Sequence, residues 1–349
     1  MRLRHALLCH TVPLDESGGG QRAAQLAREL ASRGVAVDYV ALTRRFDFER
    51  DRPADSTVSW PGVTAHLLAE LGPGQLEALV TAGSLVIVDA PHPAFAPVFQ
   101  LARARGAPTV FELIDDWDTS LGADWYDAAF QRRLVREATL VAGSARSLVE
   151  QLRALGRSDS HYVPNAADGR LFDASRAWPR PAAFEPGRRA LVYVGSLTGD
   201  WLGWAYLTQA ARALPEARLY LVGDAPRAVT SLARLYPNLR FLGLRPIEEV
   251  PAYLAHADVT LLPFLPGRVS DAVSPIKVFE YLAMGKRVVA TPLPELEGLP
   301  NITVAATSDA FAQACVQAPP AGPEGVTFAS SHTWARRVDY LLGALGLEA

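Results

Sequence analysis

The chain has 349 residues, of which 49% are hydrophobic and 20% are charged, and its formal net charge is −3 at pH 7. This length suits two domains, and the composition is that of a folded chain rather than a disordered one. A slightly acidic chain lacks the basic footprint of a nucleic-acid-binding protein, which favours a nucleotide over a polynucleotide as the ligand.

The sequence carries no signal for secretion, membrane insertion or metal binding. Its first residues turn polar too soon for a signal peptide, and no apolar run approaches the roughly 20 residues of a membrane span. Cys9 and Cys315 stand among apolar residues without metal-type spacing, so we expect two small core residues. We therefore expect a cytoplasmic protein without a metal site, and leave open a peripheral contact with the inner face of the plasma membrane.

Short apolar runs alternate with helical patterns along the first half of the chain. A helix is expected over 21–33, because its apolar residues fall on one face and Gly34 suits its exit. The candidate strands of this half cover 5–9, 37–42, 85–89, 109–114, 140–142 and 162–163. Uniformly apolar strands separated by helices indicate a parallel sheet that is covered on both faces.

A segment rich in proline and arginine interrupts this pattern at 174–189. We interpret it as a linker between an N-terminal domain over 1–173 and a C-terminal domain over 190–331. The second set of candidate strands covers 191–194, 218–222, 240–242, 259–263, 287–290 and 303–305. The sequence therefore predicts an α/β protein with two Rossmann-like, doubly wound parallel-sheet domains facing a cleft, where a ligand would bind.

Three glycines, Gly18 to Gly20, stand between the first predicted strand and the first predicted helix. Backbone amides at such a turn can approach an anion closely, and the start of the helix adds a partial positive charge. The loop matches neither the dinucleotide-binding fingerprint nor the P-loop pattern. Gly19 and Gly20 are therefore candidates for contact with a phosphate, with plain flexibility of the turn as the alternative.

A helix with both ends marked is predicted between Ser274 and Gly285. Ser274 suits its cap, Pro275 its first position and Gly285 its exit. Lys277 then lies in the first turn, where a cation costs about 0.3–1 kcal/mol unless an anion occupies the helix end. Glu280 shares a face with Lys277. We expect both to face the cleft, with Lys277 at a diphosphate and Glu280 at a ribose; an ion pair on a solvated face is the alternative.

The segment from Ser274 to Pro294 resembles the donor-binding segment of family-4-like, group 1 glycosyltransferases of the GT-B fold. The similarity is strongest to the branch related to teichuronic acid and exopolysaccharide enzymes. Further stretches agree in order, namely 18–34, 115–117, 163–172, 193–196, 221–224, 238–258 and 332–334. The match therefore covers nearly the whole chain, and its most specific part is the stretch around Lys277 and Glu280.

The resemblance implies a UDP- or GDP-linked sugar donor, no cofactor, and a sugar or lipid-linked acceptor in cell-envelope or exopolysaccharide synthesis. It also implies a retaining, metal-independent transfer and a tail over 332–349 that crosses back to the first domain. The donor-binding residues that it implies are Gly19, Gly20, Gly195, Ser196, Ser274, Ile276, Lys277 and Glu280. The chain departs from the commonest family pattern at Ala272, where a glutamate normally stands, and over 195–203, which carries no cation.

Several polar residues follow predicted strands of the first domain. His92 comes after the strand at 85–89 and could contact the sugar or the acceptor, with a solvated loop histidine as the alternative. Asp115 and Asp116 end the strand at 109–114, where either could orient or deprotonate an acceptor hydroxyl or could cap a helix. We take these three residues and Lys277 as the candidate catalytic residues. The aromatic side chains at 117, 125 and 126 could stack on an acceptor sugar, although core packing is favoured.

Sugar transfer fits these residues best, because preorganised hydrogen-bond donors at the departing diphosphate stabilise the leaving group. The missing glutamate fits a route without a protein nucleophile. A catalytically inactive nucleotide-sugar-binding protein is the first alternative. A nucleotide-sugar epimerase or a glycogen-phosphorylase-like enzyme, both also built on paired Rossmann domains, is the second.

Overall fold

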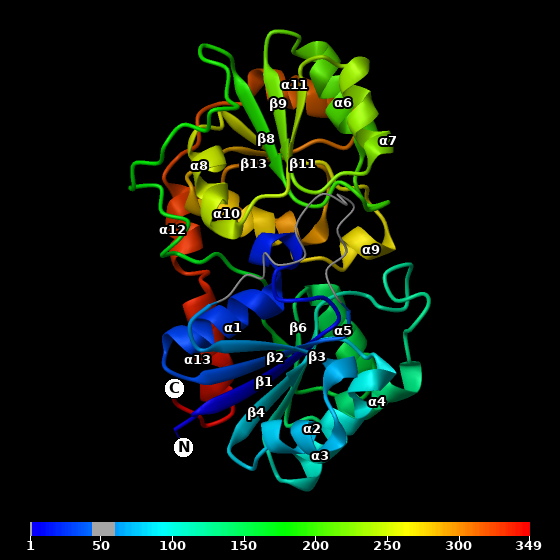
Figure 1. The fold of residues 1–349 in the computed structure, drawn as a ribbon. Helices are drawn as coiled ribbons and strands as arrows, with labels where there is room; N and C mark the ends of the chain where they lie inside the picture. The colour runs from blue at the N-terminus through cyan, green and yellow to red at the C-terminus, as the bar shows by residue number, and fades with distance from the viewer. Residues whose placement is uncertain (1, 44–59) are drawn as a thin grey trace.

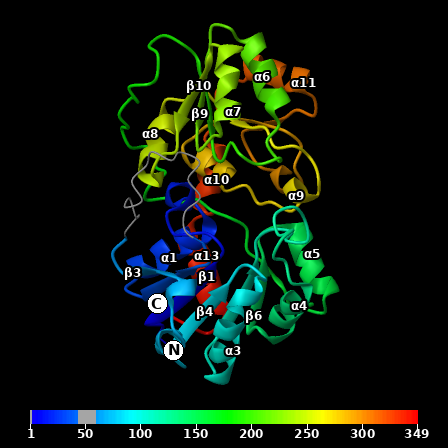
Figure 2. The ribbon, with the colours of Figure 1, turned by 45° about the vertical axis from the view of Figure 1, so that its right-hand side comes forward.

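The computed structural model describes residues 2–43 and 60–349 of the chain. They form two parallel sheets that lie one above the other, each covered by helices (Figures 1 and 2). The predicted pair of Rossmann-like, doubly wound domains is thereby confirmed. Residues 174–189, between the two sheets in the chain, contain neither a helix nor a strand.

The N-terminal sheet has seven strands in the order β3-β2-β1-β4-β5-β6-β7, and all the paired strands run parallel. The strands are β1 (His5–His10), β2 (Ala36–Ala41), β3 (Val63–Leu67), β4 (Ser84–Val88), β5 (Thr109–Leu113), β6 (Leu140–Gly143) and β7 (His161–Tyr162). Six of them fall where the sequence predicts them. β3 was not predicted, because it is a half-exposed edge strand without a continuous apolar run.

The C-terminal sheet has six parallel strands in the order β10-β9-β8-β11-β12-β13. They are β8 (Ala190–Val194), β9 (Arg218–Val222), β10 (Leu239–Gly243), β11 (Val259–Leu262), β12 (Val288–Ala290) and β13 (Ile302–Val304). All six fall within or beside predicted strands. In each sheet the order of the strands reverses between two neighbours, β1 and β4 in the first sheet and β8 and β11 in the second. Such folds bind ligands at this switch point.

Helices cover both faces of each sheet. The central strands are therefore buried on both faces, which explains why their sequences are uniformly apolar. In β1, Ala6 and Leu8 belong to one hydrophobic cluster, whereas Leu7 and Cys9 belong to another. Alternate side chains of a strand point to opposite faces, so a strand covered on both faces needs apolar residues throughout. Cys9 is buried, as is Cys315 in the other domain, in agreement with their expected place in the core.

The helices of the first domain are α1 (Arg22–Ser32), α2 (Pro73–Leu79), α3 (Ala96–Ala104), α4 (Ala128–Glu137) and α5 (Arg146–Ala154). Those that follow β8 are α6 (Trp204–Ala213), α7 (Arg227–Thr230), α8 (Val250–Ala255), α9 (Arg268–Asp271), α10 (Ile276–Ala283), α11 (Ser308–Gln317), α12 (Glu324–Ser330) and α13 (Trp334–Ala344). Figure 1 shows α9 and α10 on the side of the upper domain that faces the lower one.

The helix α13 lies in the first domain, beside α1, although it follows the second domain in the chain (Figure 1). Trp334, Val338, Leu341 and Leu342 belong to the same hydrophobic cluster as the inner face of α1.

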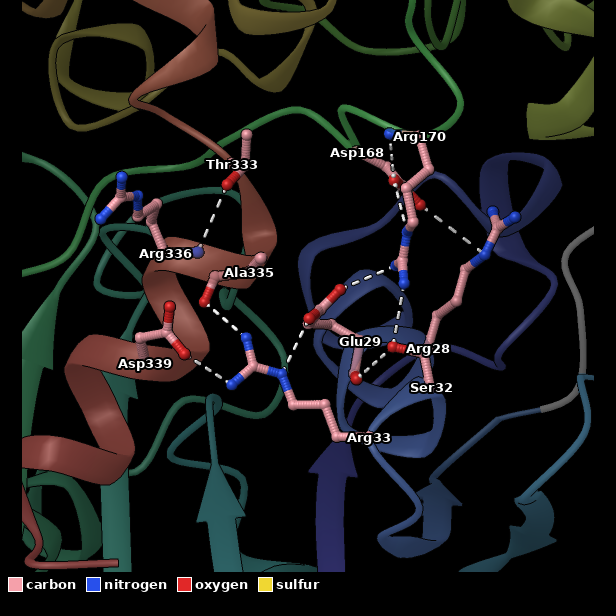
Figure 3. Close-up of polar contacts among 10 residues, drawn as sticks. All are labelled: Arg28, Glu29, Ser32, Arg33, Asp168, Arg170, Thr333, Ala335, Arg336 and Asp339. Carbon is pink, nitrogen blue, oxygen red and sulfur yellow. Dashed lines mark hydrogen bonds and ion pairs between the residues drawn. The ribbon is translucent and has the colours of Figure 1, made fainter. Parts of the chain in front are cut away.

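Polar contacts reinforce this packing (Figure 3). The Arg33 guanidinium donates to Asp339 at 2.6 Å and to the backbone oxygen of Ala335 at 2.8 Å. Glu29 of α1 accepts from both Arg33 and Arg170.

Candidate active site

A pocket of about 500 Å³ lies between the carboxyl ends of the two sheets. The first domain contributes residues that follow β1 and β5 and the start of α1. The second domain contributes the residues after β8, β9 and β10 and the amino end of α10. The lining includes Gly20, Asp115, Gly195, Ser196, Arg245 and Lys277. Both domains therefore build one site, at the position where parallel sheets of this kind hold ligands.

The amino end of α10 forms part of the pocket wall through Ser274, Ile276 and Lys277. Pro275 is the N-cap residue, so Lys277 lies in the first turn, as the sequence predicts. The predicted cap by Ser274 is wrong, because the Ser274 hydroxyl accepts a hydrogen bond from the backbone N–H of Asn165 at 3.1 Å. Asn165 belongs to the other domain, so a contact between the domains takes the hydroxyl. No side chain caps α10, which leaves its first N–H groups at the pocket.

Lys277 and Glu280 lie on one side of α10, but only Lys277 lines the pocket. The Nζ atom of Lys277 is 3.1 Å from Oε2 of Glu280, which is 2% exposed and lies behind the lysine. The expectation that both side chains face the cleft therefore holds for the lysine alone. Burial raises the pKa of Glu280, and the Lys277 charge opposes that rise. Glu280 is buried and Lys277 is half-buried, so the pair does not lie on a solvated face, which was the alternative.

The glycine turn brings the first domain against the second. Gly18 has a φ of +68°, and a Cβ there would lie 2.2 Å from the backbone oxygen of Arg245. Gly19 has a φ of +85° and faces the ring of Trp60. Gly20 lines the pocket, but Gly19 does not. Of the two predicted phosphate contacts, the structure thus brings Gly20 to the pocket, while Gly18 makes the close approach between the domains.

Glycines also bring two strand ends of the second domain together. Gly195, after β8, has a φ of +153°, and its N–H donates to the Val222 carbonyl at 2.9 Å. A Cβ on Gly223, after β9, would lie 1.8 Å from the Gly195 oxygen, so only glycine fits there. Gly195 and Ser196 both line the pocket. The Ser196 hydroxyl lies 2.7 Å from that of Thr198.

Arg245 is a pocket residue that the sequence analysis missed. It lies after β10, and its buried Nε has no hydrogen-bond partner among the described residues. The segment where a second cation was expected, 195–203 after the first strand of the domain, carries none. Arg245 could have been predicted from its position just after Gly243, at the carboxyl end of β10. Arg245, Lys277 and Arg22, which is paired with Glu112, are the positive side chains among the described residues of the pocket lining.

Asp115 and Asp116 face different partners. Asp115 lines the pocket, and burial raises its pKa to about 7; His10 opposes this rise, whereas Asp89 and Asp116 add to it. Asp116 is buried and accepts from the Arg268 guanidinium of α9 at 2.7 and 3.3 Å. Arg268 also pairs with Asp118 at 3.2 Å. Asp116 thus takes part in an ion pair between the domains, and of these two aspartates only Asp115 lines the pocket, as Glu16 and Asp224 also do.

His92 and the nearby aromatic residues lie beside the pocket and do not line it. Nδ1 of His92 accepts from the Ala94 N–H at 3.1 Å, which caps the short 3-10 helix η3 (Pro93–Phe95). The His92 ring packs 5.3 Å from that of Trp125, which in turn lies 5.0 Å from Trp117. Trp117 is buried in the core of the first domain, as core packing predicts. Burial lowers the pKa of His92.

No group of three or more histidine, cysteine, aspartate or glutamate side chains gathers in residues 2–43 and 60–349 in a way that could hold a metal ion. None of the helices in these ranges is both long and apolar enough to span a membrane.

Two parallel sheets that share a pocket at their carboxyl ends define the GT-B class of proteins. Residues 17–166 match the family described as glycosyl transferase 4-like domain, and residues 188–318 match glycosyl transferases group 1. These two matches cover both domains in the expected order. The chain belongs to the group 1 glycosyltransferases, as the resemblance at Ser274–Pro294 indicates.

One relative is TuaH of Bacillus subtilis (strain 168), which is described as a candidate teichuronic acid biosynthesis glycosyltransferase. It is 31% identical over 170 residues, which are 46% of this chain and 42% of TuaH. The match therefore spans less than half of either protein.

Solved structures share the whole fold at low sequence identity. Sucrose-phosphate synthase from Thermosynechococcus elongatus is 18% identical, with a TM-score of 0.70 over 98% of each chain. Alr3699/HepE of Anabaena, in complex with UDP-glucose, is 16% identical, with a TM-score of 0.69 over 98% of this chain and 99% of that one. These likenesses concern the fold.

Proposed function

We propose that this glycosyltransferase moves a sugar from a UDP- or GDP-linked donor to a hydroxyl of a sugar or lipid-linked acceptor. The observation that carries the proposal is the pocket of about 500 Å³, which has Lys277 on one wall and Asp115 on the opposite domain. Cations suit a nucleoside diphosphate, and a carboxylate suits a hydroxyl group. The UDP-glucose complex of Anabaena Alr3699/HepE, a protein of the same fold, supports a nucleotide sugar as the donor.

On the donor side, we assign the diphosphate to Lys277, the uncapped amides of α10 and Arg245. Gly20 at the start of α1 would approach it from the other domain. As the bond to the anomeric carbon breaks, negative charge grows on the diphosphate, and fixed positive groups there stabilise the transition state. We assign Glu280 to a ribose hydroxyl, which requires the carboxylate to turn from behind Lys277. Gly195, Ser196, Ser274 and Ile276 complete the proposed donor site.

On the acceptor side, we assign Asp115 as the group that activates the attacking hydroxyl. The acceptor O–H bond breaks as its oxygen bonds to the anomeric carbon, and the proton moves to Asp115. At the same time the bond between the anomeric carbon and the diphosphate oxygen breaks, and its electron pair leaves with the diphosphate. Ala272, at the position of the family glutamate, supports a route without a protein nucleophile and with retention of configuration.

The biological setting that we propose is cell-envelope or exopolysaccharide synthesis at the cytoplasmic side of the plasma membrane. The similarity to TuaH, which is described as a candidate glycosyltransferase of teichuronic acid biosynthesis, supports this setting. A peripheral contact with the membrane would bring a lipid-linked acceptor to the Asp115 side of the pocket.

The experiment that tests this function is a screen of UDP-, GDP- and dTDP-sugars by thermal shift, followed by turnover with mass detection. A product one sugar heavier than its acceptor, or release of the free sugar by water, supports transfer. An isomerised nucleotide sugar would point to epimerisation instead. Binding of a nucleotide sugar without any turnover would point to a catalytically inactive binding protein.

We expect turnover to persist in the presence of EDTA. Lys277, Arg245 and the first amides of α10 place positive charge where a metal would otherwise bridge the diphosphate oxygens. The check is a comparison of turnover in EDTA with turnover in added Mg²⁺ or Mn²⁺. Loss of activity in EDTA that the metal restores would contradict this assignment.

Replacing Glu280 with glutamine is expected to weaken the binding of the nucleoside diphosphate alone, by about three- to tenfold. A carboxylate accepts more strongly from ribose hydroxyls than an amide does. Calorimetry with UDP and GDP measures the loss, and Glu295→Gln, a buried glutamate outside the pocket, serves as the control. Unchanged affinity in the Glu280 variant, together with lower stability, would leave the residue a structural partner of Lys277.

A further inference from the structure

Three titratable side chains lie at the ends of three neighbouring strands beneath the acceptor side of the pocket. His10 is the last residue of β1, Asp89 directly follows β4, and Asp115 follows β5. These strands are adjacent in the sheet order. Only Asp115 reaches the pocket lining. The mechanism above uses Asp115 and gives no role to the other two.

His10 and Asp89 form a buried pair. Nδ1 of His10 lies 2.8 and 2.7 Å from the two carboxylate oxygens of Asp89, and the two residues are 4% and 2% exposed. Burial alone would lower the pKa of His10, but the charge and the hydrogen bond of Asp89 outweigh it, so the pKa is raised. Burial also raises the pKa of Asp89, and His10 opposes that rise, so the two side chains stabilise each other in their charged forms.

The groups around His10 are either acidic or neutral, so His10 is the positively charged group that acts on Asp115. Glu16 and Asp115 face it from the neighbouring loops, and both raise its pKa further. The buried Tyr39 ring and the Cys9 thiol also lie near, and burial raises the pKa of each, which keeps them neutral.

The other charged side chains of this region already have partners. Arg22 is paired with Glu112 at 2.7 Å, and Asp116 with Arg268.

We infer that His10, held by Asp89, is a positioning residue that keeps Asp115 ionised and ready to accept the proton of the acceptor hydroxyl. This inference rests on the proposed function. It adds that the pair of His10 and Asp89 controls the protonation of Asp115, the carboxylate that activates the acceptor. A carboxyl group that is buried without a nearby positive charge keeps its proton at neutral pH, and therefore it cannot accept a second one. The imidazolium counters this effect, and Asp89 prevents its loss of charge.

The test is a pH titration of the Asp115 carboxyl carbon, followed by NMR in protein labelled with ¹³C-aspartate. The Asp115 signal is identified by its absence from the spectrum of Asp115→Asn. In wild type we expect a midpoint near pH 7. In His10→Gln we expect the midpoint to rise by about one pH unit, since the nearby cation is gone. His5→Gln is the matched control, because His5 lies on the same strand and pairs with Asp38 at 2.8 Å, at the opposite end of β1.

A second measurement needs no variant. In the wild-type protein, the imidazole ¹⁵N shifts of His10 should show both nitrogens protonated through the titration of Asp115. A neutral His10 at pH 7, or a midpoint that moves equally in the two histidine variants or in neither, overturns the inference.

Turnover separates this inference from the proposed function. If the wild type transfers sugar, His10→Gln should lower the rate at pH 7 about fivefold and shift the acid limb of the pH profile upward, with UDP or GDP affinity unchanged. A slower variant with an unshifted limb overturns the role of His10. Wild-type protein without any transfer would contradict the proposed function, while the NMR titration would still decide the role of the pair.

Discussion

Replacing Lys277 with alanine is expected to lower the affinity for UDP or GDP about ten- to a hundredfold. The change removes a charge-assisted contact worth about 1.5–3 kcal/mol. Turnover should fall as well, because the same charge stabilises the diphosphate as it departs. Isothermal calorimetry with the nucleoside diphosphate and steady-state turnover with the nucleotide sugar measure the two effects. The fold should survive, since Glu280 can accept a proton once its partner is gone.

The chain provides a matched control, because Lys286 is its other lysine. The Lys286 ammonium donates to the backbone oxygens of Ala255, the last residue of α8, at 2.7 Å and of Ala257 at 3.1 Å, and Lys286 lies outside the pocket. Lys286→Ala should reduce stability by about 1 kcal/mol and leave nucleotide affinity unchanged. Equal nucleotide affinity in both lysine variants, with lower stability in the Lys277 variant, would make Lys277 a structural residue.

Replacing Gly18 with alanine should slow turnover about a hundredfold, because it pushes the two halves of the pocket apart. The new Cβ would lie 2.2 Å from the Arg245 oxygen, and a tolerable contact needs at least 3.0 Å. The shift moves Arg245 and the start of α1, which line opposite sides of the pocket. Displacements of this size at a catalytic site cost about two orders of magnitude in rate.

Gly34→Ala separates the clash from backbone strain. Gly34 has a φ of +82°, comparable to that of Gly18, but nothing lies within 4 Å of the position its Cβ would take. An alanine there costs about 1–2 kcal/mol of stability from the left-handed backbone alone. Its turnover should match that of wild type. If the two variants lose the same stability and neither loses turnover, then the contact between Gly18 and Arg245 does not hold the pocket together.

The fold could be predicted from the sequence because covered parallel strands must be apolar on both faces. β4 and β5 are buried along their whole length and were found for this reason. β3 contains only half-buried and exposed residues at the edge of its sheet, so it carried no such signal. Gly285 ends α10 with a φ of +64°, in agreement with its predicted place at the exit.

The candidate site could be predicted only in part, because its geometry depends on contacts between domains. The first turn of α10 is a local feature, so the place of Lys277 followed from Pro275 and Gly285. The contact between Ser274 and Asn165 joins residues 109 positions apart, and that between Asp116 and Arg268 joins residues 152 apart. No pattern within one segment reveals such a partner. The sequence therefore could not separate the pocket carboxylate Asp115 from its neighbour.

The position of α13 constrains the order in which the two domains can complete their folding during synthesis. Trp334 and Leu341 belong to the core beside α1, and the Leu3 N–H donates to the Glu348 oxygen at 2.6 Å. When the ribosome has synthesised the first domain, that part of its core still lacks a covering helix, which emerges only after the whole second domain. The nascent first domain therefore exposes this apolar surface until α13 has been synthesised. The second domain, in contrast, can fold as soon as it leaves the exit tunnel.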